Sequence, residues 1–370
     1  MWFLILAACA GPGAPSTPSP PVEDTAPSGT DGTDGTDGTD GTDGTDGTDG
    51  GDPWAALRAD IDASSLGDAT VLFGTAEGVA FQHDKGESDE DKVYLAASAS
   101  KLLASITVLR LVDAGALSLD DAPQDHLDWW PTDPADPRTG VTLEQLLSFT
   151  SGLEGGVDDV PCVEDGGSTL AACAQEIAEG RFVYAPGSTF FYGPSHLQVA
   201  GALVSAQQGQ SWNRVFRAQV GSPLGLAATT AFASPSLANP RVAGGATVSA
   251  ADYGAVLTAL AAGTLLRPET AAALVADHTP EGVALENLPV AAAGWHYALG
   301  CWRECAGGTY TPDCDAPGVV SSPGAFGFYP LWDQARGIWG VIATHHPDGA
   351  SATVPLGHAW LESAAAALGR

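Results

Sequence analysis

The stretch YLAASASKLLAS, residues 94–105, places a lysine three residues after a serine at the start of an apolar run. The chain has only three lysines, and Ser98–Lys101 is its only pair with the spacing Ser-x-x-Lys. Residues three apart lie on one face of a helix, so the hydroxyl and the amine can meet. A serine hydroxyl is an effective nucleophile only when a neighbouring base takes its proton. The spacing therefore indicates nucleophilic catalysis, and the alternative is a helix-capping serine beside a surface lysine.

The helix that carries this pair is predicted from Ser98 to Asp113, because Gly115 follows it as a typical C-cap. Ser98 then lies at the helix N-terminus, where the helix dipole favours the negative charge of an attacking alkoxide. Two more helices are predicted, over 54–63 and over the alanine-rich end at 357–368.

Strands are expected near both ends of the chain, and the residues between them, about 115–270, are rich in Ala, Leu, Pro and Gly without clear strands. We therefore predict an α/β (α+β) fold with a central, mainly antiparallel sheet flanked by helices and an inserted, mostly helical subdomain. The predicted strands cover residues 69–73, 78–83, 297–303, 319–328 and 337–345.

Composition bounds the class of protein. The apolar fraction of 44% is ample for a buried core, and the formal charge is −31. Such an excess of acid argues against binding nucleic acid, because a phosphate backbone would be repelled. It disfavours an anionic membrane surface for the same reason, and solubility is the simplest use of so much acid.

The first residues, MWFLILAACA, contain an apolar stretch that is too short to cross a bilayer as a helix. Leu6-Ala7-Ala8-Cys9 is similar to the cleavage box of bacterial lipoproteins. Residues 1–8 are then a signal peptide, and Cys9 is the lipidated first residue of an exported, envelope-anchored protein. The alternatives are an ordinary secretion signal and a misassigned start.

A low-complexity segment follows, with TDG repeated seven times from Thr30 to Gly50. Residues 10–52 contain ten acidic residues and no basic one. No large apolar residue interrupts the repeat, so nothing can be buried to offset the entropy of ordering it. Residues 9–52 are therefore expected to form a disordered tether for one folded domain at 53–370. Calcium binding by the repeats is the weaker alternative, since the spacing matches no known calcium loop.

The remaining cysteines fit an exported protein. Cys162 and Cys173 bracket a short Gly-containing loop, as do Cys305 and Cys314, and we expect a local disulfide in each case. Cys301 lies in an alternating stretch that predicts a strand with a buried free thiol. A zinc site is the alternative, but the chain has no Cys-x-x-Cys and no helical histidine pair.

Four further stretches follow the Ser-x-x-Lys pair in order. They are LRLVDAGALSLDDAPQDHL (109–127), VTLEQLLSFTSGL (141–153), APGSTFFYGPSHLQVAGALV (185–204) and RVAGGATVSAADYGAVLTAL (241–260). In this order they resemble the serine β-lactamase and penicillin-binding-protein superfamily, particularly its class C-like esterase and D-aminopeptidase/carboxypeptidase branch. The resemblance covers nearly all of residues 54–370, and Phe149 occupies the usual histidine place of the family segment "LLxHTSGL".

The resemblance implies roles for individual residues. Ser98 would be the acylated nucleophile, Lys101 its proton acceptor or electrostatic partner, and Tyr192 the tyrosine of the second motif, usually Tyr-x-Asn. Here that triplet is Tyr-Gly-Pro, so its amide is absent. Ser195 or His196 would be substitutes, although a packed or capping histidine is the simpler interpretation of His196.

The third family motif, usually Lys/His-x-Gly, is best matched by Ser322-Pro323-Gly324. Gly324 would let the substrate approach the backbone, and the amides of Ala325 and Ser98 would form the oxyanion hole. The motif lacks its cation, and Ser322 offers one uncharged hydrogen bond instead. This difference favours an ester or neutral amide over a substrate recognised by its carboxylate.

Together these observations predict a membrane-tethered serine hydrolase that acts through an acyl-enzyme without metal or organic cofactor. Its substrate would be a small ester, an amide or a peptidoglycan-derived molecule. Esterase activity is expected first, D-amino-acid peptidase activity second and β-lactamase activity third. The alternative on the same fold is a cell-envelope binding protein with weakened turnover, and an unrelated sugar- or peptide-binding lipoprotein is the remaining alternative.

Overall fold

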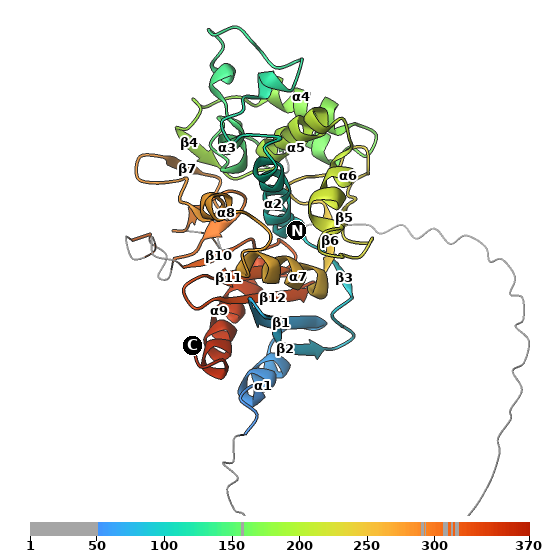
Figure 1. Cartoon of the computed structure of the whole chain (residues 1–370), viewed down its shortest axis with the longest axis vertical. Helices are drawn as coiled ribbons and strands as arrows, with labels where there is room; N and C mark the ends of the chain where they lie inside the picture. Colours follow the sequence, from blue (N-terminus) through green and yellow to red (C-terminus); the bar gives the residue numbers. More distant parts are fainter. Residues whose placement is uncertain are drawn as a thin grey trace, which may run out of the picture. The chain divides into compact units, whose positions relative to one another are not determined.

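Strands from the two ends of the chain form one antiparallel sheet in the computed structural model (Figure 1). The order in this sheet is β2-β1-β12-β11-β10-β9-β8, so the first strand of the chain pairs with its last. This sheet and its helices confirm the predicted fold class. The structure describes residues 51–156, 159–289, 292, 294–305, 310–311, 314 and 318–370. The strands of the sheet are β1 (Ala69–Thr75), β2 (Gly78–Lys85), β8 (His296–Tyr297), β9 (Trp302–Arg303), β10 (Val319–Ser321), β11 (Tyr329–Asp333) and β12 (Ile338–Thr344).

Helices pack on both faces of the large sheet. Successive side chains of a strand point to opposite faces, so Trp339 and Ile342 of β12 lie on different faces. Gly254 of α7 (Ala250–Ala261) packs against Trp339, whereas Gly357 of α9 (Ala350–Ala367) packs near Ile342. The first helix, α1 (Ala55–Ala63), contacts α9 and β2. The sheet is therefore the middle layer of three.

The helical region contains most of the residues between the end strands (Figure 1). Its central helix is α5, which is buried over most of its length and contacts α2, α3, α4 and α6. Two small sheets, β3-β6-β5 and the parallel pair β4-β7, accompany these helices. The helices are α2 (Ser100–Asp113), α3 (Leu143–Leu147), α4 (Leu170–Gly180), α5 (Ser195–Gln208), α6 (Trp212–Phe216) and α8 (Pro268–Val275). The strands are β3 (Val93–Leu95), β4 (Thr189–Phe191), β5 (Ala231–Phe232), β6 (Ala246–Ser249) and β7 (Ala284–Glu286). Short helical turns are η1 (Ala97–Ala99), η2 (Pro123–Asp125), η3 (Pro137–Gly140), η5 (Pro161–Glu164) and η6 (Arg217–Gly221).

Several element boundaries differ from the predictions. The single strand predicted over 297–303 is wrong, because Gly300, with φ +74, lies in a turn that separates β8 from β9. The strand predicted over 319–328 ends at Ser321, after which a turn leads into β11. The last helix begins at Ala350 and includes Pro355, which lies outside the predicted range of 357–368. Helix α7 lies within the range expected for the inserted region, yet it packs on the large sheet.

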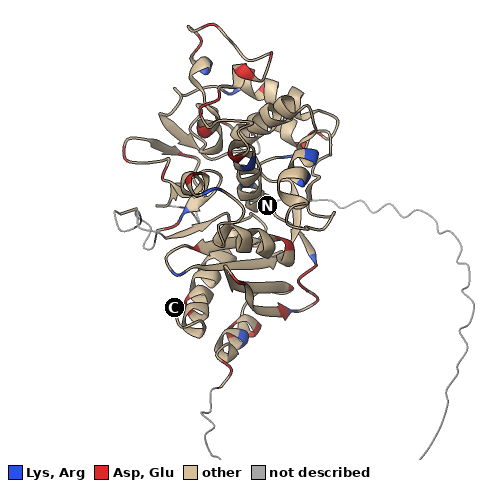
Figure 2. Cartoon of the chain, viewed as in Figure 1, with Lys and Arg blue, Asp and Glu red and all other residues tan. Residues whose placement is uncertain are grey.

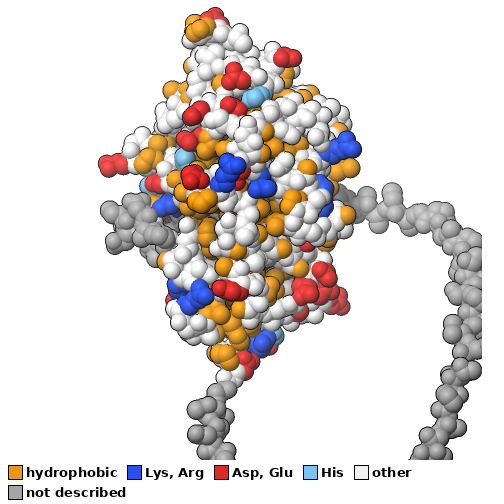
Figure 3. Space-filling view, viewed as in Figure 1, with side chains coloured by type: hydrophobic (Ala, Val, Ile, Leu, Met, Phe, Trp, Pro, Cys, Tyr) orange, Lys and Arg blue, Asp and Glu red, His pale blue; other side chains and the backbone are white. Residues whose placement is uncertain are grey.

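Charged residues are scattered over the described elements (Figure 2). On the face shown in Figure 3, acidic and basic side chains lie among neutral and apolar ones. Within the described ranges, no helix combines the length and apolarity that crossing a bilayer requires. Residues 1–50, which include the predicted signal peptide, Cys9 and the TDG repeats, lie outside the described residues.

Candidate active site

Ser98 lies in η1, the helical turn that leads directly into α2. Helix α2 therefore begins two residues later than predicted. The residue before the serine, Ala97, has φ 45, which lies in the left-handed region that side chains other than glycine rarely adopt. Such strain is typical of functional sites, where the surrounding fold holds a residue in place. The turn brings Ser98 to the wall of a cavity.

Lys101 is 5% exposed, and its amine faces three partners. Nζ donates to Ser98 Oγ at 2.9 Å and to the backbone oxygen of Ala243 at 2.9 Å. Nζ also lies 4.8 Å from the ring centre of Tyr192, above its face. A cation over an aromatic face is attracted by the electrons of the ring. The amine is thus held against the serine hydroxyl through neutral groups.

Tyr192 follows β4 and rests on an aromatic cluster. Its ring centre is 5.1 Å from that of Trp302, 5.9 Å from Phe149 and 6.2 Å from Tyr297. The side chain of Asn287 donates to the Tyr192 backbone oxygen at 2.6 Å. This packing fixes the ring that Lys101 lies over, so Ser98, Lys101 and Tyr192 line one cavity although they come from separate segments.

The Ser322-Pro323-Gly324 segment follows β10 and packs against the turn that holds Ser98. The Ser322 hydroxyl donates to the backbone oxygen of Ser98 at 2.8 Å, and Ser322 is 2% exposed. A Cβ at position 324 would collide with the backbone oxygen of Ala96, so glycine is required for this close approach. Ala325 lines the cavity, whereas the Ser322 hydroxyl is used inside the protein.

Ser195 and His196 lie at the start of α5, and neither is among the residues that line the cavity. The Ser195 hydroxyl donates to the backbone oxygen of Glu154 at 2.6 Å. His196 Nε2 donates to the Phe191 backbone oxygen at 2.9 Å, which leaves Nδ1 to accept from the Ser151 hydroxyl at 2.8 Å. Both groups are therefore engaged in local structure.

The environment of His196 keeps its ring neutral. The ring is completely buried and stacks on Phe149 with 4.9 Å between ring centres. Burial lowers the pKa of His196 to about 3, because the charged imidazolium would lose its hydration. A neutral ring with both nitrogens paired supports the interpretation of His196 as a packed residue.

The cavity has a volume of about 240 Å³, and its wall is mostly apolar or glycine. Its polar side chains belong to Ser98, Lys101, Tyr192, Arg241 and Asn287, and none of the described lining residues is acidic. The lining residues are Ala97, Ser98, Lys101, Gly156, Val163, Tyr192, Gly193, Pro194, Arg241, Ala243, Gly244, Asn287, Ala325 and Phe326.

Sequence reasoning missed two of these polar residues. Arg241 begins a stretch that had been matched as a whole, RVAGGATVSAADYG, but nothing marked its side chain as facing the cavity. It pairs with Glu164, and its Nη2 donates to Ser234 Oγ at 3.0 Å. Asn287 is 95 residues away from Tyr192 in sequence, so no local spacing could have linked them.

Cysteine pairs join short loops at two places. Cys162 is bonded to Cys173 with 5.3 Å between their Cα atoms, and Cys305 to Cys314 with 5.5 Å. Cys301 is buried and free, and burial raises its pKa to about 12, so its thiol stays protonated. Among the described residues, no cluster of three or more His, Cys, Asp or Glu side chains could hold a metal ion.

The arrangement supplies the groups that nucleophilic acyl transfer requires. A hydroxyl contacts an amine at hydrogen-bonding distance, a phenol ring lies 4.8 Å from that amine, and backbone from two segments meets at the nucleophile. An activated hydroxyl next to a polar backbone can attack a carbonyl and stabilise the oxyanion that forms.

Comparison with known proteins gives the family. A family model described as Beta-lactamase matches residues 48–364. Penicillin-binding protein 4 of Amycolatopsis lactamdurans is 31% identical over 174 residues, which cover 47% of this chain and 43% of that protein. Esterase EstB of Burkholderia gladioli is 32% identical over 173 residues, which cover 42% of this chain and 43% of that protein. The chain thus matches less than half the length of each of these curated relatives.

Similarity to solved structures extends over most of the folded part. The hydrolase EstCE1, which has promiscuous acyltransferase activity, superposes with a TM-score of 0.66 at 20% sequence identity. The superposition covers 82% of this chain and 96% of that one, and at this identity it shows the fold alone. The family match, in contrast, takes in most of the chain. This chain therefore belongs to the β-lactamase family, a family of serine hydrolases with esterase and penicillin-binding-protein relatives.

Proposed function

We propose that the protein is a serine hydrolase in which Ser98 forms an acyl-enzyme. The observation that carries this proposal is the 2.9 Å contact between Lys101 Nζ and Ser98 Oγ at the wall of a cavity. A lysine that is 5% exposed and hydrogen-bonded to a serine hydroxyl is poorly explained as a surface residue. Catalysis explains both its burial and its partner.

In the proposed reaction, Ser98 Oγ attacks the substrate carbonyl carbon while Lys101 or Tyr192 takes the hydroxyl proton. The carbonyl oxygen becomes an oxyanion, which the backbone N–H groups of Ser98 and Ala325 stabilise. The carbon–leaving-group bond then breaks, and the leaving group receives the proton. Water attacks the acyl-enzyme in the second half, releasing the acid and restoring the Ser98 hydroxyl.

The third motif supports an uncharged acyl substrate over one recognised by its carboxylate, and the Arg241 guanidinium at the cavity is already paired with Glu164. The third motif has Ser322 where the family motif usually has Lys or His, and that hydroxyl is already used on the Ser98 backbone. A charge-assisted hydrogen bond contributes about 1.5–3 kcal/mol, and a hydroxyl that is already engaged does not replace it, so β-lactam affinity should fall at least about tenfold. We therefore rank esterase activity first, D-amino-acid peptidase activity second and β-lactamase activity third.

A covalent probe tests the assignment of the nucleophile. A fluorophosphonate or a chromogenic short-chain ester should react with the wild-type protein and fail to react with Ser98→Ala. Intact mass after exposure to esters, D-alanyl peptides and penicillins then reports which acyl group is retained. Equal labelling of wild type and Ser98→Ala would rule out Ser98.

Product release from the chromogenic ester distinguishes a hydrolase from the alternative, a cell-envelope binding protein with weakened turnover. It would release one equivalent of product in a burst and then stop, whereas a turning-over hydrolase continues. The retained contact between the scarce Lys101 and Ser98 favours turnover.

We further propose that the protein is exported and anchored to the envelope through lipid on Cys9, with residues 10–52 as a flexible spacer. The cleavage-box sequence, the acidic repeat and the disulfide Cys162–Cys173 support this proposal. The anchor would leave the cavity free to meet small molecules in the envelope.

A further inference from the structure

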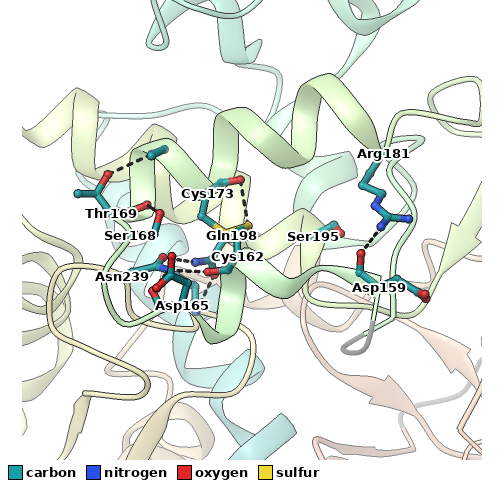
Figure 4. The surroundings of a disulfide bond; sticks show 12 residues. Asp159, Cys162, Asp165, Ser168, Thr169, Cys173, Arg181, Ser195, Gln198 and Asn239 are labelled. Carbon is teal, nitrogen blue, oxygen red and sulfur yellow. Dashed lines mark hydrogen bonds between the residues drawn. A yellow bond between two sulfur atoms is a disulfide. The ribbon is translucent and has the colours of Figure 1, made fainter.

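Two buried amide side chains hold the backbone segment that ends at Ala243. Gln198 comes from α5 and Asn239 from the loop that leads into the segment, and both are completely buried. Figure 4 shows the two side chains beside the Cys162–Cys173 disulfide. A buried amide without hydrogen-bond partners costs free energy. The partners of Gln198 and Asn239 therefore show which backbone segments these side chains stabilise.

Gln198 forms hydrogen bonds with the backbone of segment 240–243. Its Oε1 accepts from the backbone N–H of Val242 at 3.2 Å, and its Nε2 donates to the backbone oxygen of Pro240 at 3.2 Å. The second Nε2 hydrogen goes to Asn239 Oδ1 at 3.0 Å. Rotating the amide by half a turn would set like groups against each other at all three contacts, so only one orientation is satisfied.

Asn239 continues the network to another part of the chain. Its Nδ2 donates to the backbone oxygens of Cys162 at 2.7 Å and Asp165 at 3.0 Å. Every amide hydrogen of both side chains is therefore used. Cys162 is fixed in turn by its disulfide to Cys173, and its neighbour Val163 lines the cavity.

The segment 240–243 contacts the proposed catalytic amine. The residue after Val242 is Ala243, whose backbone oxygen accepts from Lys101 Nζ at 2.9 Å. Helix α5 also approaches Val242 closely, because a Cβ at Gly201 would collide with the valine side chain. Buried contacts from α5 thus fix the backbone at residues 242 and 243. The Ala243 backbone oxygen in turn fixes the position of the Lys101 amine.

We infer that Gln198 and Asn239 are positioning residues that set the direction of the Ala243 carbonyl and, through it, the place of the Lys101 amine beside Ser98. The inference rests on the proposed function. Neither side chain lines the cavity, so an effect on the reaction must be indirect, through the 240–243 backbone that carries the acceptor of Lys101 or through the loop of Cys162 and Val163. The same network joins the walls formed by Val163 and Ala243.

Isosteric variants test the inference. Asn239→Asp replaces two donors with an oxygen facing two carbonyl oxygens, and Gln198→Met leaves Pro240 and Val242 without their partner. The matched control is Asn213→Asp, because Asn213 likewise bridges a backbone N–H and C=O, those of Phe232, but has no contact with the segment. Thermal unfolding of the three variants measures how much stability each substitution removes.

The readout is the saturation kinetics of fluorophosphonate labelling as a function of pH. Both network variants should lower the limiting labelling rate at least about tenfold with little change in probe affinity, since a small misplacement of a catalytic group costs up to about 100-fold. The pH dependence of this limiting rate should also change, because the Ala243 carbonyl that accepts from the Lys101 amine loses its fixed direction. Asn213→Asp should keep the wild-type profile even where its stability falls.

The outcomes separate this inference from the proposed function. An unlabelled wild type would overturn the hydrolase assignment, and hydrogen exchange at Val242 N–H would then show whether Gln198→Met still frees that amide, as the network requires. A labelled wild type with network variants that match Asn213→Asp in rate and pH profile would overturn the positioning role. If one network variant does not fold, the other carries the same comparison.

Discussion

Lys101 is buried without a carboxylate among its described partners, and neutral groups receive its N–H bonds. Desolvating an amine costs free energy unless its donors are satisfied. The Ser98 hydroxyl, the Ala243 carbonyl and the Tyr192 ring together offset this cost for Lys101. A carboxylate partner would have pinned the charge on the lysine. Neutral partners therefore fit the role in proton transfer that is proposed for Lys101.

At the same scale, His196 predicts a pH dependence of stability. The folded protein keeps the ring neutral down to its pKa of about 3, whereas the unfolded chain takes up a proton below the ordinary value of 6.5. The unfolded state therefore binds more protons, and stability is lost as pH falls from about 6.5 towards 3. The contribution of this one group is about 1.4 kcal/mol per pH unit.

Denaturant unfolding between pH 6 and pH 4 measures this slope. His196→Gln cannot titrate, so its free energy of unfolding should fall less steeply than that of the wild type by about 1.4 kcal/mol per pH unit. The carboxyl groups contribute to both proteins and cancel in the difference. Identical slopes would show that His196 is protonated equally in both states.

At the scale of elements, the segment after β10 must approach the turn that carries Ser98. The Ser322 hydroxyl joins the two, and Gly324 packs where a side chain would meet the Ala96 backbone oxygen. Because backbone cannot yield as a flexible side chain does, any larger residue has to displace one of the two elements. The proposed oxyanion amides of Ser98 and Ala325 come from these same elements.

Gly324→Ala should therefore reduce fluorophosphonate labelling by about 100-fold, since the oxyanion donors depend on this approach. Rates measured at saturating probe give the comparison. Gly67→Ala is the control, because a Cβ there meets nothing within 4 Å, and it should label at the wild-type rate. If Gly324→Ala were labelled at the wild-type rate, the close approach of the two segments would not be needed for the reaction.

At the scale of the whole molecule, the proposed anchor predicts lipid on Cys9, which precedes the folded domain in sequence. Radiolabelled fatty acid should label the wild type in a bacterial host and not Cys9→Ala. The 43 residues of 10–52 would span roughly 35–40 Å as a flexible chain, and charge repulsion would lengthen it. Absence of label from the wild type would end the lipoprotein hypothesis.

Sequence alone determined the features that depend on local pattern. Short apolar runs separated by glycines predict the strands at 69–73 and 78–83, and a glycine C-cap predicts the helix ending at Asp113, because these signals act over a few residues. The sheet built from both chain ends is expected because strand patterns occur at both ends of the sequence. The hydrophobic pattern could not show where a chain reverses inside an apolar run. The turn at Gly300 and the short strands β8 and β9 are the result.

Ser98 and Lys101 were identified for the same reason, since a spacing of three places both side chains on one helical face. Only the tertiary structure could decide that the Ala243 carbonyl, 142 residues further on, receives the lysine amine, or that Asn287 supports Tyr192. Only it decided that the Ser322 hydroxyl turns inward to the Ser98 backbone. Contacts between distant segments arise from packing of the whole chain, and no local periodicity records them.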